Sequence, residues 1–556
     1  MVVRLYTIMA DTEYISQFAD MSLDHTSGSR IDTLPIQLRE YQVPCVNNVL
    51  DVWEDGRPAI ISSQTGSGKT YMGSMAAYLY GAQYVFVLGP KSSLSKWRNV
   101  LSLVFPPSSI YCGTYEGWKY CGTLEVPSPK QPYTTRIHRE REGGGIGYDF
   151  ESSDIWNELV WNYRCVFILD EFHKLQKPSQ RTYATAANTR PIILYECPSR
   201  ILALSYTPCD NLSDIPMHLY LLGMTNGTHL AEYNKRTKTY DTRGLQGVYD
   251  IAASFEKVSI EDKNNVTNAK YLKGRLTHNR VNAIAGQLFL RYIRKYIVFF
   301  CNPDFVTDET LIPVYNNYFC KVSKHASDTI MTIIAGGVGE EKAIENFMHI
   351  VEDTSNMAAL TSIQQALEKV KRPLYLELAK EWLEKHPNGK VAIMVLYLDT
   401  MDELCDALIK YNPVRIEGCM NGDARDVSIN TFQAHNLDSR VIIATLTTGG
   451  ESIDLHDTSP DGNYPRLLLI PPCFYTKPTI QASGRVFRDS VTSKPTIKIV
   501  YTATLAGNKY VEHRFYESVR RKSDVVKQYH AEGQNSKLPC DYQDIISKKV
   551  YRTSVD

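Results

Sequence analysis

The chain has 556 residues, of which 43% are apolar and 22% are charged. This length allows two or more domains with separate cores, and the composition is ordinary for a soluble globular protein. Basic and acidic residues number 61 each, so the formal net charge is zero. The balance excludes a protein coated in positive charge, although a local basic groove for nucleic acid remains compatible with it.

The cysteine and hydropathy patterns exclude further classes of protein. Twelve cysteines occur without a C-x-x-C pair, so the sequence indicates neither a zinc module nor a disulfide framework. The apolar run 296–301 is far too short to cross a bilayer. The segment 1–20 carries acidic residues and lacks the apolar region of a signal peptide. We therefore expect a soluble intracellular protein, in the cytoplasm or the nucleus, without membrane contact.

A phosphate-binding loop is predicted at residues 62–70, which read Ser-Ser-Gln-Thr-Gly-Ser-Gly-Lys-Thr after the apolar run 59–61. In a strand–turn–helix context, backbone N–H groups and the positive end of the helix can surround a polyphosphate. Lys69 is expected to reach the β- and γ-phosphates, and the Thr70 hydroxyl is expected to hold Mg²⁺. Ser63 stands where the strict pattern has glycine. A simple Gly/Ser turn beside a lysine is therefore the alternative.

A contact with the base is predicted about 25 residues earlier, in the segment 38–42 at the start of an amphipathic helix. We expect Gln42 to hydrogen-bond the adenine edge while the Tyr41 ring packs against the base. On its own this segment is only a helix start, so the hypothesis depends on the phosphate loop that follows.

Two segments between the main motifs carry structural expectations. The apolar strand 84–88 leads into the polar stretch 89–97, whose Trp97 is expected to lie in the core. Residues 122–150 contain several prolines, several arginines and a triple glycine, and we expect a loop insertion there.

The main partner of the phosphate loop is an acidic pair after the apolar strand 166–169. Such a strand is typical of a parallel sheet that is buried on both faces. Asp170 is expected to bind Mg²⁺ through water, and Glu171 to orient and deprotonate the attacking water. A surface acidic pair is the alternative, but it fits poorly with the end of so apolar a strand.

The last motif is the segment 481–488, which reads Q-x-x-G-R-x-x-R. Gln481, Arg485 and Arg488 are spaced by four and three residues, which predicts that they share one face of a helix. Such a face can direct two guanidinium groups at a γ-phosphate held by another lobe and stabilise the charge of the transferring phosphoryl group. A helix with two surface arginines is the alternative.

The order of these motifs resembles superfamily 2 helicases and translocases of the DExH type. Residues 90–97, 173–179 and 207–212 look specifically like the Snf2 branch, whereas the flank of the phosphate loop looks more like XPB-type and viral relatives. The mixture is similar to the helicase-like ATPases of large DNA viruses, including the Snf2-like nucleoside triphosphatases of poxviruses. The segment 447–455 resembles the family's fifth motif, although Ser452 stands in place of the usual glycine.

The resemblance implies an α/β fold of two tandem RecA-like domains of the P-loop NTPase type. Each would have a mainly parallel sheet with helices on both faces. The expected division is a flexible N-terminal extension (1–30), a first RecA-like ATP-binding domain (31–215), a helical insertion or linker (216–375), a second RecA-like domain (376–530) and a tail (531–556).

The resemblance also implies that ATP and Mg²⁺ bind in the cleft between the two domains. The implied catalytic residues are Lys69, Glu171, Gln481, Arg485 and Arg488. The implied nucleotide contacts are Tyr41, Gln42, Ser63, Gln64, Thr65, Gly66, Ser67, Gly68, Lys69, Thr70 and Asp454, with Thr70 and Asp170 for the metal. The residues implied to couple the cleft to nucleic acid are His173, Ser205, Thr207 and Thr447.

The implied function is an ATP-dependent translocase or helicase that acts on nucleic acid, with DNA preferred to RNA, in viral transcription or replication machinery. One alternative is an RNA helicase. Another is a structural subunit of a transcription complex that binds nucleotide and hydrolyses little of it. A P-loop nucleotide kinase or a transporter ATPase does not explain residues 481–488 or 205–207.

Overall fold

The computed structural model describes most of the chain from residue 35 onward. The described residues are 35–63, 66–123, 128, 130–140, 146–194, 197–206, 208–209, 211–225, 227, 230–234, 236–273, 277–301, 310–311, 313–321, 357–420, 422–449, 453–472, 476–488, 490–503, 512, 525, 528–529 and 549–553. The expected extension 1–30, most of the expected tail 531–556, and three predicted site residues, Gln64, Thr65 and Thr207, lie outside them.

The first sheet has six strands, all parallel, in the order β11-β1-β8-β7-β2-β3. Its strands are β1 (Ala59–Ile61), β2 (Tyr84–Gly89), β3 (Ile110–Thr114), β7 (Cys165–Asp170), β8 (Arg200–Leu204) and β11 (Val298–Phe299). Every residue of β1 and β7 is buried, which explains their nearly continuous apolar sequences. The helices of this half are α2 (Val43–Glu54), α3 (Lys69–Leu79), α4 (Lys91–Leu101), α5 (Tyr115–Trp118), α6 (Asp154–Asn162), α7 (Gln180–Leu194) and α8 (Ile215–Leu221).

A small antiparallel hairpin interrupts this half between β3 and β7. It consists of β5 (Thr134–Glu140) and β6 (Ile146–Ser152), and β4 (Gly122–Thr123) adds to β5. The side-chain amide of Gln131 fixes its base by donating to the carbonyl of Trp118 at 2.8 Å. The expectation of a loop insertion at 122–150 is therefore wrong for these strands, because the alternation of a polar hairpin carries little hydrophobic signal.

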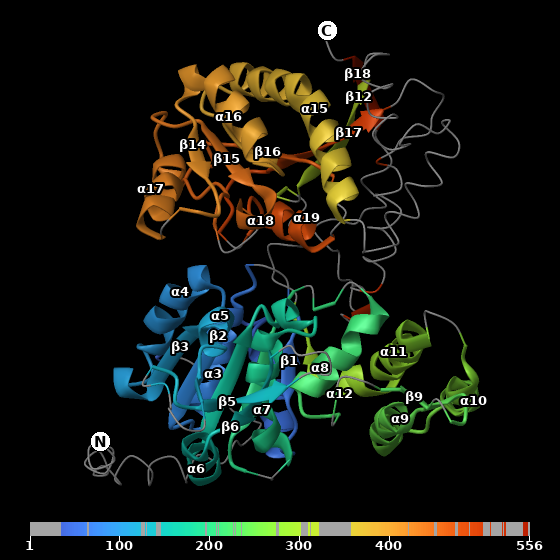
Figure 1. The fold of residues 1–556 in the computed structure, drawn as a ribbon. Helices are drawn as coiled ribbons and strands as arrows, with labels where there is room; N and C mark the ends of the chain where they lie inside the picture. The colour runs from blue at the N-terminus through green and yellow to red at the C-terminus, as the bar shows by residue number, and fades with distance from the viewer. Residues whose placement is uncertain are drawn as a thin grey trace.

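A group of helices lies beside the first sheet and shares its hydrophobic core (Figure 1). They are α9 (Arg243–Phe255), α10 (Ile260–Asn268), α11 (Thr277–Leu288) and α12 (Arg294–Ile297), preceded by the strand pair β9 (Glu232–Asn234) and β10 (Thr239–Asp241). The chain then returns to the first sheet as its edge strand β11.

The second sheet has seven parallel strands in the order β14-β15-β13-β16-β17-β12-β18. Its strands are β12 (Val314–Lys321), β13 (Lys390–Val395), β14 (Val414–Ile416), β15 (Val441–Thr445), β16 (Arg466–Ile470), β17 (Thr496–Ala503) and β18 (Lys549–Thr553). The accompanying helices are α15 (Met357–Lys385), α16 (Leu398–Ala407), α17 (Gly422–Gln433), α18 (Leu446–Gly449) and α19 (Thr476–Ser483).

Two strands of this sheet come from unexpected places in the sequence. β12 lies in the segment that was expected to be a helical linker, and β18 lies in the expected tail. Both pair into the second sheet, so this sheet draws on residues beyond 376–530. The fold is thus an α/β arrangement of two mainly parallel sheets, the RecA-like architecture expected from the motifs.

Figure 1 shows the two halves one above the other, with the blue-to-green half below and the yellow-to-red half above. The short helices α18 and α19 lie on the side of the upper half that faces the lower one. Within the described part of the chain, no helix combines the length and apolarity that a membrane crossing requires.

Candidate active site

The phosphate loop lies between β1 and α3, as its motif predicts. Gly66 has φ +84° and Gly68 has φ +81°, a left-handed backbone that favours glycine. Ser67 is fully buried between them. The loop therefore enters the amino end of α3 through two turns that only small residues accommodate, which is the geometry of a phosphate-binding loop.

Lys69 begins α3 and points back over the loop. Its Nζ donates to the carbonyl oxygen of Ser63 at 2.7 Å, so this ammonium group spans the loop. Burial lowers the pKa of Lys69, while the charges of Glu171 and Asp170 act in the opposite direction. Ser63, the departure from the strict motif, uses its hydroxyl to accept a hydrogen bond from the backbone N–H of Cys301 at 2.8 Å. The serine thus ties the loop to the residues just after β11.

Asp170 ends the buried strand β7 and faces two aromatic side chains. The indole Nε1 of Trp97 donates to Asp170 Oδ2 at 3.0 Å, and the Tyr115 hydroxyl donates to the Asp170 backbone carbonyl at 2.8 Å. Trp97 is buried as expected, but it also carries this polar contact. Burial and the charge of Glu171 raise the pKa of Asp170. The raised pKa means that the surrounding protein offers Asp170 less positive charge than its ionised form requires.

Glu171 follows in a left-handed conformation, with φ 52° and ψ 46°. A residue with a side chain adopts this region at a cost of about 1–2 kcal/mol, and such strain is concentrated at functional sites. Its Oε2 lies 3.2 Å from His173 Nδ1, which is also 2.9 Å from the Ser205 hydroxyl. Burial alone would raise the pKa of Glu171, but the hydrogen bond and charge of His173 and the charge of Lys69 outweigh it and lower that pKa. Glu171 is therefore held ionised.

Gln42 contacts the phosphate loop directly. Its Nε2 donates to the carbonyl oxygen of Ser67 at 2.8 Å, and its Oε1 accepts from the backbone N–H of Arg39 at 3.0 Å. The residue is only 5% exposed. Both ends of the amide are thus engaged by the protein, and Tyr41 beside it packs against the first core. The geometry supports a brace for the loop, and the contact of Gln42 with adenine stays a prediction.

The arginines of the last motif reach the first half of the molecule. A Cβ atom at Gly66 would lie 3.1 Å from Cγ of Arg488, so Arg488 lies against the phosphate loop. The charge of Arg485 contributes to the low pKa of Glu171. Asp454 forms an ion pair with Arg488 on the same side of the cleft. Residues from both sheets therefore meet at one site.

The prediction that Gln481, Arg485 and Arg488 share one face of a helix is wrong. α19 ends at Ser483, and the next residue, Gly484, starts a turn in which Arg485 N–H bonds to the carbonyl of Ala482 at 3.0 Å. A glycine directly after a helix favours termination there. Gln481 is buried on the helix, Arg485 lies on the turn, and Arg488 follows three residues later. Thr447 lies exposed on the short helix α18.

Two residues that the sequence analysis did not assign to the site lie at it. Partial desolvation lowers the pKa of Lys96 on α4, although the residue is exposed, and the charges of Arg488, Asp454 and Asp170 also act on it. Tyr115 contacts Asp170 from α5. The sequence carried a partial signal for Lys96, because this residue precedes Trp97 in the Snf2-like segment 90–97. It carried no signal for Tyr115.

The residues present fit a magnesium ion bound with a nucleotide. Thr70 and Asp170 offer a hydroxyl and a carboxylate, and Asp170 has a raised pKa that a nearby cation would relieve. Mg²⁺ prefers oxygen ligands and takes the rest of its shell from phosphates and water. The donor set is thus that of a nucleotide-bound Mg²⁺.

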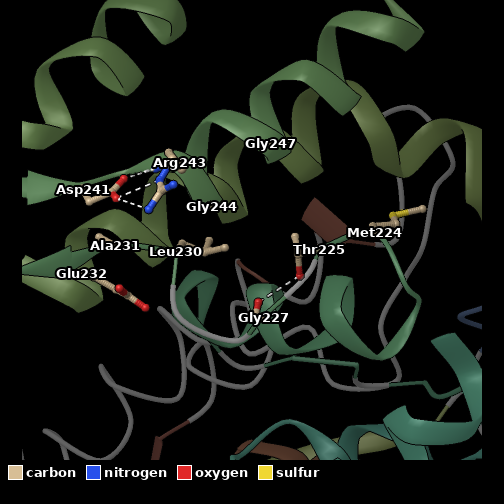
Figure 2. Close-up of a pocket in the computed structure, with 10 residues that line it drawn as sticks. All are labelled: Met224, Thr225, Gly227, Leu230, Ala231, Glu232, Asp241, Arg243, Gly244 and Gly247. Atoms are coloured by element: carbon tan, nitrogen blue, oxygen red, sulfur yellow. Dashed lines mark hydrogen bonds and ion pairs between the residues drawn. The ribbon is translucent and has the colours of Figure 1, made fainter. Parts of the chain in front are cut away.

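A separate pocket of about 420 Å³ lies between the β9–β10 pair and the start of α9 (Figure 2). None of the predicted site residues lines it. Two of its three charged residues, Asp241 and Arg243, pair with each other at 2.7 Å, and Glu232 is the third. The pocket does not belong to the nucleotide site.

Comparison with known proteins agrees with the nucleotide-binding site that the geometry indicates. Residues 35–210 match the family model of the type III restriction enzyme, res subunit. The putative ATP-dependent RNA helicase L364 of Acanthamoeba polyphaga mimivirus is 24% identical over 498 residues, covering 87% of this chain and 82% of that protein. DNA repair protein rhp54 of Schizosaccharomyces pombe is 24% identical over 58% of this chain. The chain is thus similar to Snf2-like proteins of helicase superfamily 2. This similarity indicates a nucleic-acid-dependent ATPase.

The chain spans only part of the length of the eukaryotic relatives that it matches. It spans 37% of the length of rhp54 and 14% of human chromodomain-helicase-DNA-binding protein 9, to which it is 24% identical over 461 residues. A solved SWI2/SNF2 ATPase core from Sulfolobus solfataricus in complex with dsDNA is 14% identical and covers 84% of this chain. Its TM-score is 0.30, too low for that superposition to bear on the assignment.

Proposed function

We propose that this Snf2-like chain is an ATP-driven translocase that moves on nucleic acid, with DNA preferred to RNA. The observation that supports this most directly is the meeting of two halves at one site. Arg488 lies against Gly66, and Arg485 acts on Glu171, although the arginines and their targets belong to different sheets. A site divided in this way works only when the halves are together, which ties each turnover to their relative movement.

Each residue of the site has a distinct proposed task. Lys69 and the N–H groups of the loop bind the phosphates, and Thr70 and Asp170 hold Mg²⁺, which when bound would neutralise charge on the phosphates. Glu171, held ionised, accepts a hydrogen bond from the attacking water and orients it. Arg485 and Arg488 stabilise the charge of the transferring phosphoryl group, with Gln481 supporting their turn.

The link from cleft to nucleic acid is proposed to run through His173. Its ring contacts both Glu171 and Ser205, and the Ser205 N–H bonds to the carbonyl of Ile61 at 3.2 Å. Movement at Glu171 therefore reaches the carboxyl ends of β1 and β8, where Thr207 follows. In the second half, Thr447 and Asp454 are the corresponding proposed contacts. We propose that release of phosphate lets these ends separate and advances the chain along its track.

The preference for DNA is supported by the names of several relatives. Rhp54 is named a DNA repair protein, and other relatives are named chromatin-remodeling ATPases. One relative, which aligns to 87% of this chain, is a mimivirus protein, and this supports a role in viral transcription or replication. That protein is named an RNA helicase, so translocation on RNA is the second candidate function.

The test is steady-state ATP turnover with no nucleic acid, with single-stranded DNA, with duplex DNA and with RNA, each at several salt concentrations. Salt matters because phosphate contacts weaken steeply as ionic strength rises. Lys69→Ala and Glu171→Gln serve as controls that remove the phosphate contact and the water contact. We expect DNA to stimulate turnover more than RNA does. Greater stimulation of turnover by RNA than by DNA would support the second candidate function, translocation on RNA.

Two further outcomes separate the remaining possibility, a structural subunit that hydrolyses little. Nucleotide binding without turnover under any condition would support that role and overturn the proposal. ATP turnover that no nucleic acid stimulates would also overturn the proposal, because hydrolysis would then not depend on nucleic acid.

A further inference from the structure

Two helices of the first half converge on Asp170 with one aromatic donor each. α4 supplies Trp97, whose indole N–H bonds to the carboxylate oxygen Oδ2 at 3.0 Å. α5 supplies Tyr115, whose hydroxyl bonds to the backbone carbonyl at 2.8 Å. Trp97 is 1% exposed and Tyr115 is 3% exposed, so water does not compete for either bond. These contacts join residues 73 and 55 positions apart in the sequence.

We propose that Trp97 and Tyr115 are positioning residues that hold Asp170 in the orientation required for Mg²⁺. This inference rests on the proposed function, because it concerns the metal of the same site. The two residues act through Asp170, one by fixing its side chain and the other by fixing its backbone.

The geometry explains why two anchors are needed. Asp170 lies at the end of β7, directly before Glu171, whose left-handed backbone turns the chain sharply. The indole engages Oδ2, and the Ser93 side chain is a further hydrogen-bond partner of the same carboxylate. The Tyr115 bond to the Asp170 carbonyl holds the peptide that begins the strained turn. Loss of either anchor lets the carboxylate adopt orientations that do not serve the metal.

The backbone of β2 leaves room for this arrangement. A Cβ atom at Gly89 would lie 3.0 Å from Asp170 Cβ and 3.2 Å from the Ser93 hydroxyl. Such distances are tighter than ordinary contacts, so a larger residue would push Asp170 away from the indole. The glycine, the indole and the carboxylate thus form one packed unit at the end of the sheet.

The chain offers a matched control for each anchor. Trp156 is fully buried in the same half, and its Nε1 donates to the carbonyl of Asn188 at 2.9 Å. The Tyr80 hydroxyl donates to the carbonyl of Pro198 at 2.7 Å. Trp156→Phe and Tyr80→Phe therefore remove the same donors from sites without contact to Asp170.

The experiment measures binding of a fluorescent, non-hydrolysable ATP analogue to the full chain, first in EDTA and then across a Mg²⁺ titration. In Trp97→Phe we expect unchanged affinity in EDTA and a Mg²⁺ midpoint raised about tenfold, the effect of losing one hydrogen bond to a charged group. Tyr115→Phe is expected to raise it by a smaller factor. Both control variants should keep the wild-type midpoint. In parallel, ATP hydrolysis by Trp97→Phe and Tyr115→Phe should show a larger fall in kcat than change in KM.

Thermal unfolding of each variant separates positioning from folding. If Trp97→Phe does not fold, Tyr115→Phe carries the test, because it removes one hydroxyl and leaves the ring packing intact. A folded Trp97→Phe with the wild-type Mg²⁺ midpoint would overturn the inference and leave the proposed function standing. Equal shifts in Trp156→Phe would also overturn it, since the effect would then be one of general packing. Wild-type chain that binds the analogue equally well with and without Mg²⁺ would overturn the proposed metal site and this inference with it.

Discussion

Gln42 provides the sharpest test of how the nucleotide site is built. Its amide bridges the phosphate loop, through Ser67, and the segment before α2, through Arg39. If it acts as a brace, Gln42→Ala should weaken every nucleoside triphosphate equally. If it reads the base, the substitution should weaken ATP alone.

The magnitude follows from the contacts that are lost. Gln42→Ala removes one buried hydrogen bond of 2.8 Å and one partly buried hydrogen bond of 3.0 Å, each with a net contribution of about 1 kcal/mol. A total of about 2 kcal/mol corresponds to nucleotide binding roughly 30-fold weaker. Gln42→Glu should cost at least as much, because it sets a carboxylate oxygen against the carbonyl of Ser67.

The assay is competition of ATP and of GTP against a fluorescent nucleotide, for wild type and for both variants. Gln131→Ala is the matched control, since that buried amide braces the β5–β6 hairpin instead. The bracing argument requires that the ratio of ATP to GTP affinity stays within a few-fold of wild type. A loss for ATP more than about tenfold larger than the loss for GTP would refute it and assign Gln42 to the base.

Three further predictions concern the second half. Arg488→Ala should lower turnover by about 10³-fold while leaving nucleotide binding largely intact, as measured by single-turnover hydrolysis alongside equilibrium binding; an equal loss in affinity would contradict the assigned role. Lys371→Met should cost about 3–5 kcal/mol in urea unfolding, because it strands the buried Glu512 carboxylate 2.7 Å away, whereas the exposed neighbour variant Lys369→Met should cost little. Burial lowers the pKa of His456 to about 4. Since the unfolded side chain titrates near 6.5, native stability should fall by up to about 3 kcal/mol as pH drops from about 6.5 to about 4. His456→Gln should flatten that fall, and an unchanged profile would show that His456 is not its source.

Local sequence determined the strands and the motifs at their ends. β1 and β7 read as continuous apolar runs because they are buried on both faces of a parallel sheet. In such sheets the functional residues follow the carboxyl ends of strands, so Asp170 and Ser205 were predictable from what precedes them. The two glycines at 66 and 68 were predictable because only a left-handed turn joins this strand to α3 so tightly.

Contacts between distant segments were decided only by the tertiary structure. Nothing near Trp97 in the sequence indicates that its N–H faces Asp170, and nothing near Tyr115 indicates its bond to the same residue. The end of α19 before Arg485 was missed because the spacing of the motif fits a helix, while the glycine that follows Ser483 ends it. β12 gains its place only by pairing with β17, and the edge strand β18 only by pairing with β12, and both neighbours are remote in the sequence. Local pattern reports burial and backbone preference, whereas side-chain partners and strand neighbours depend on where the folded chain brings remote residues together.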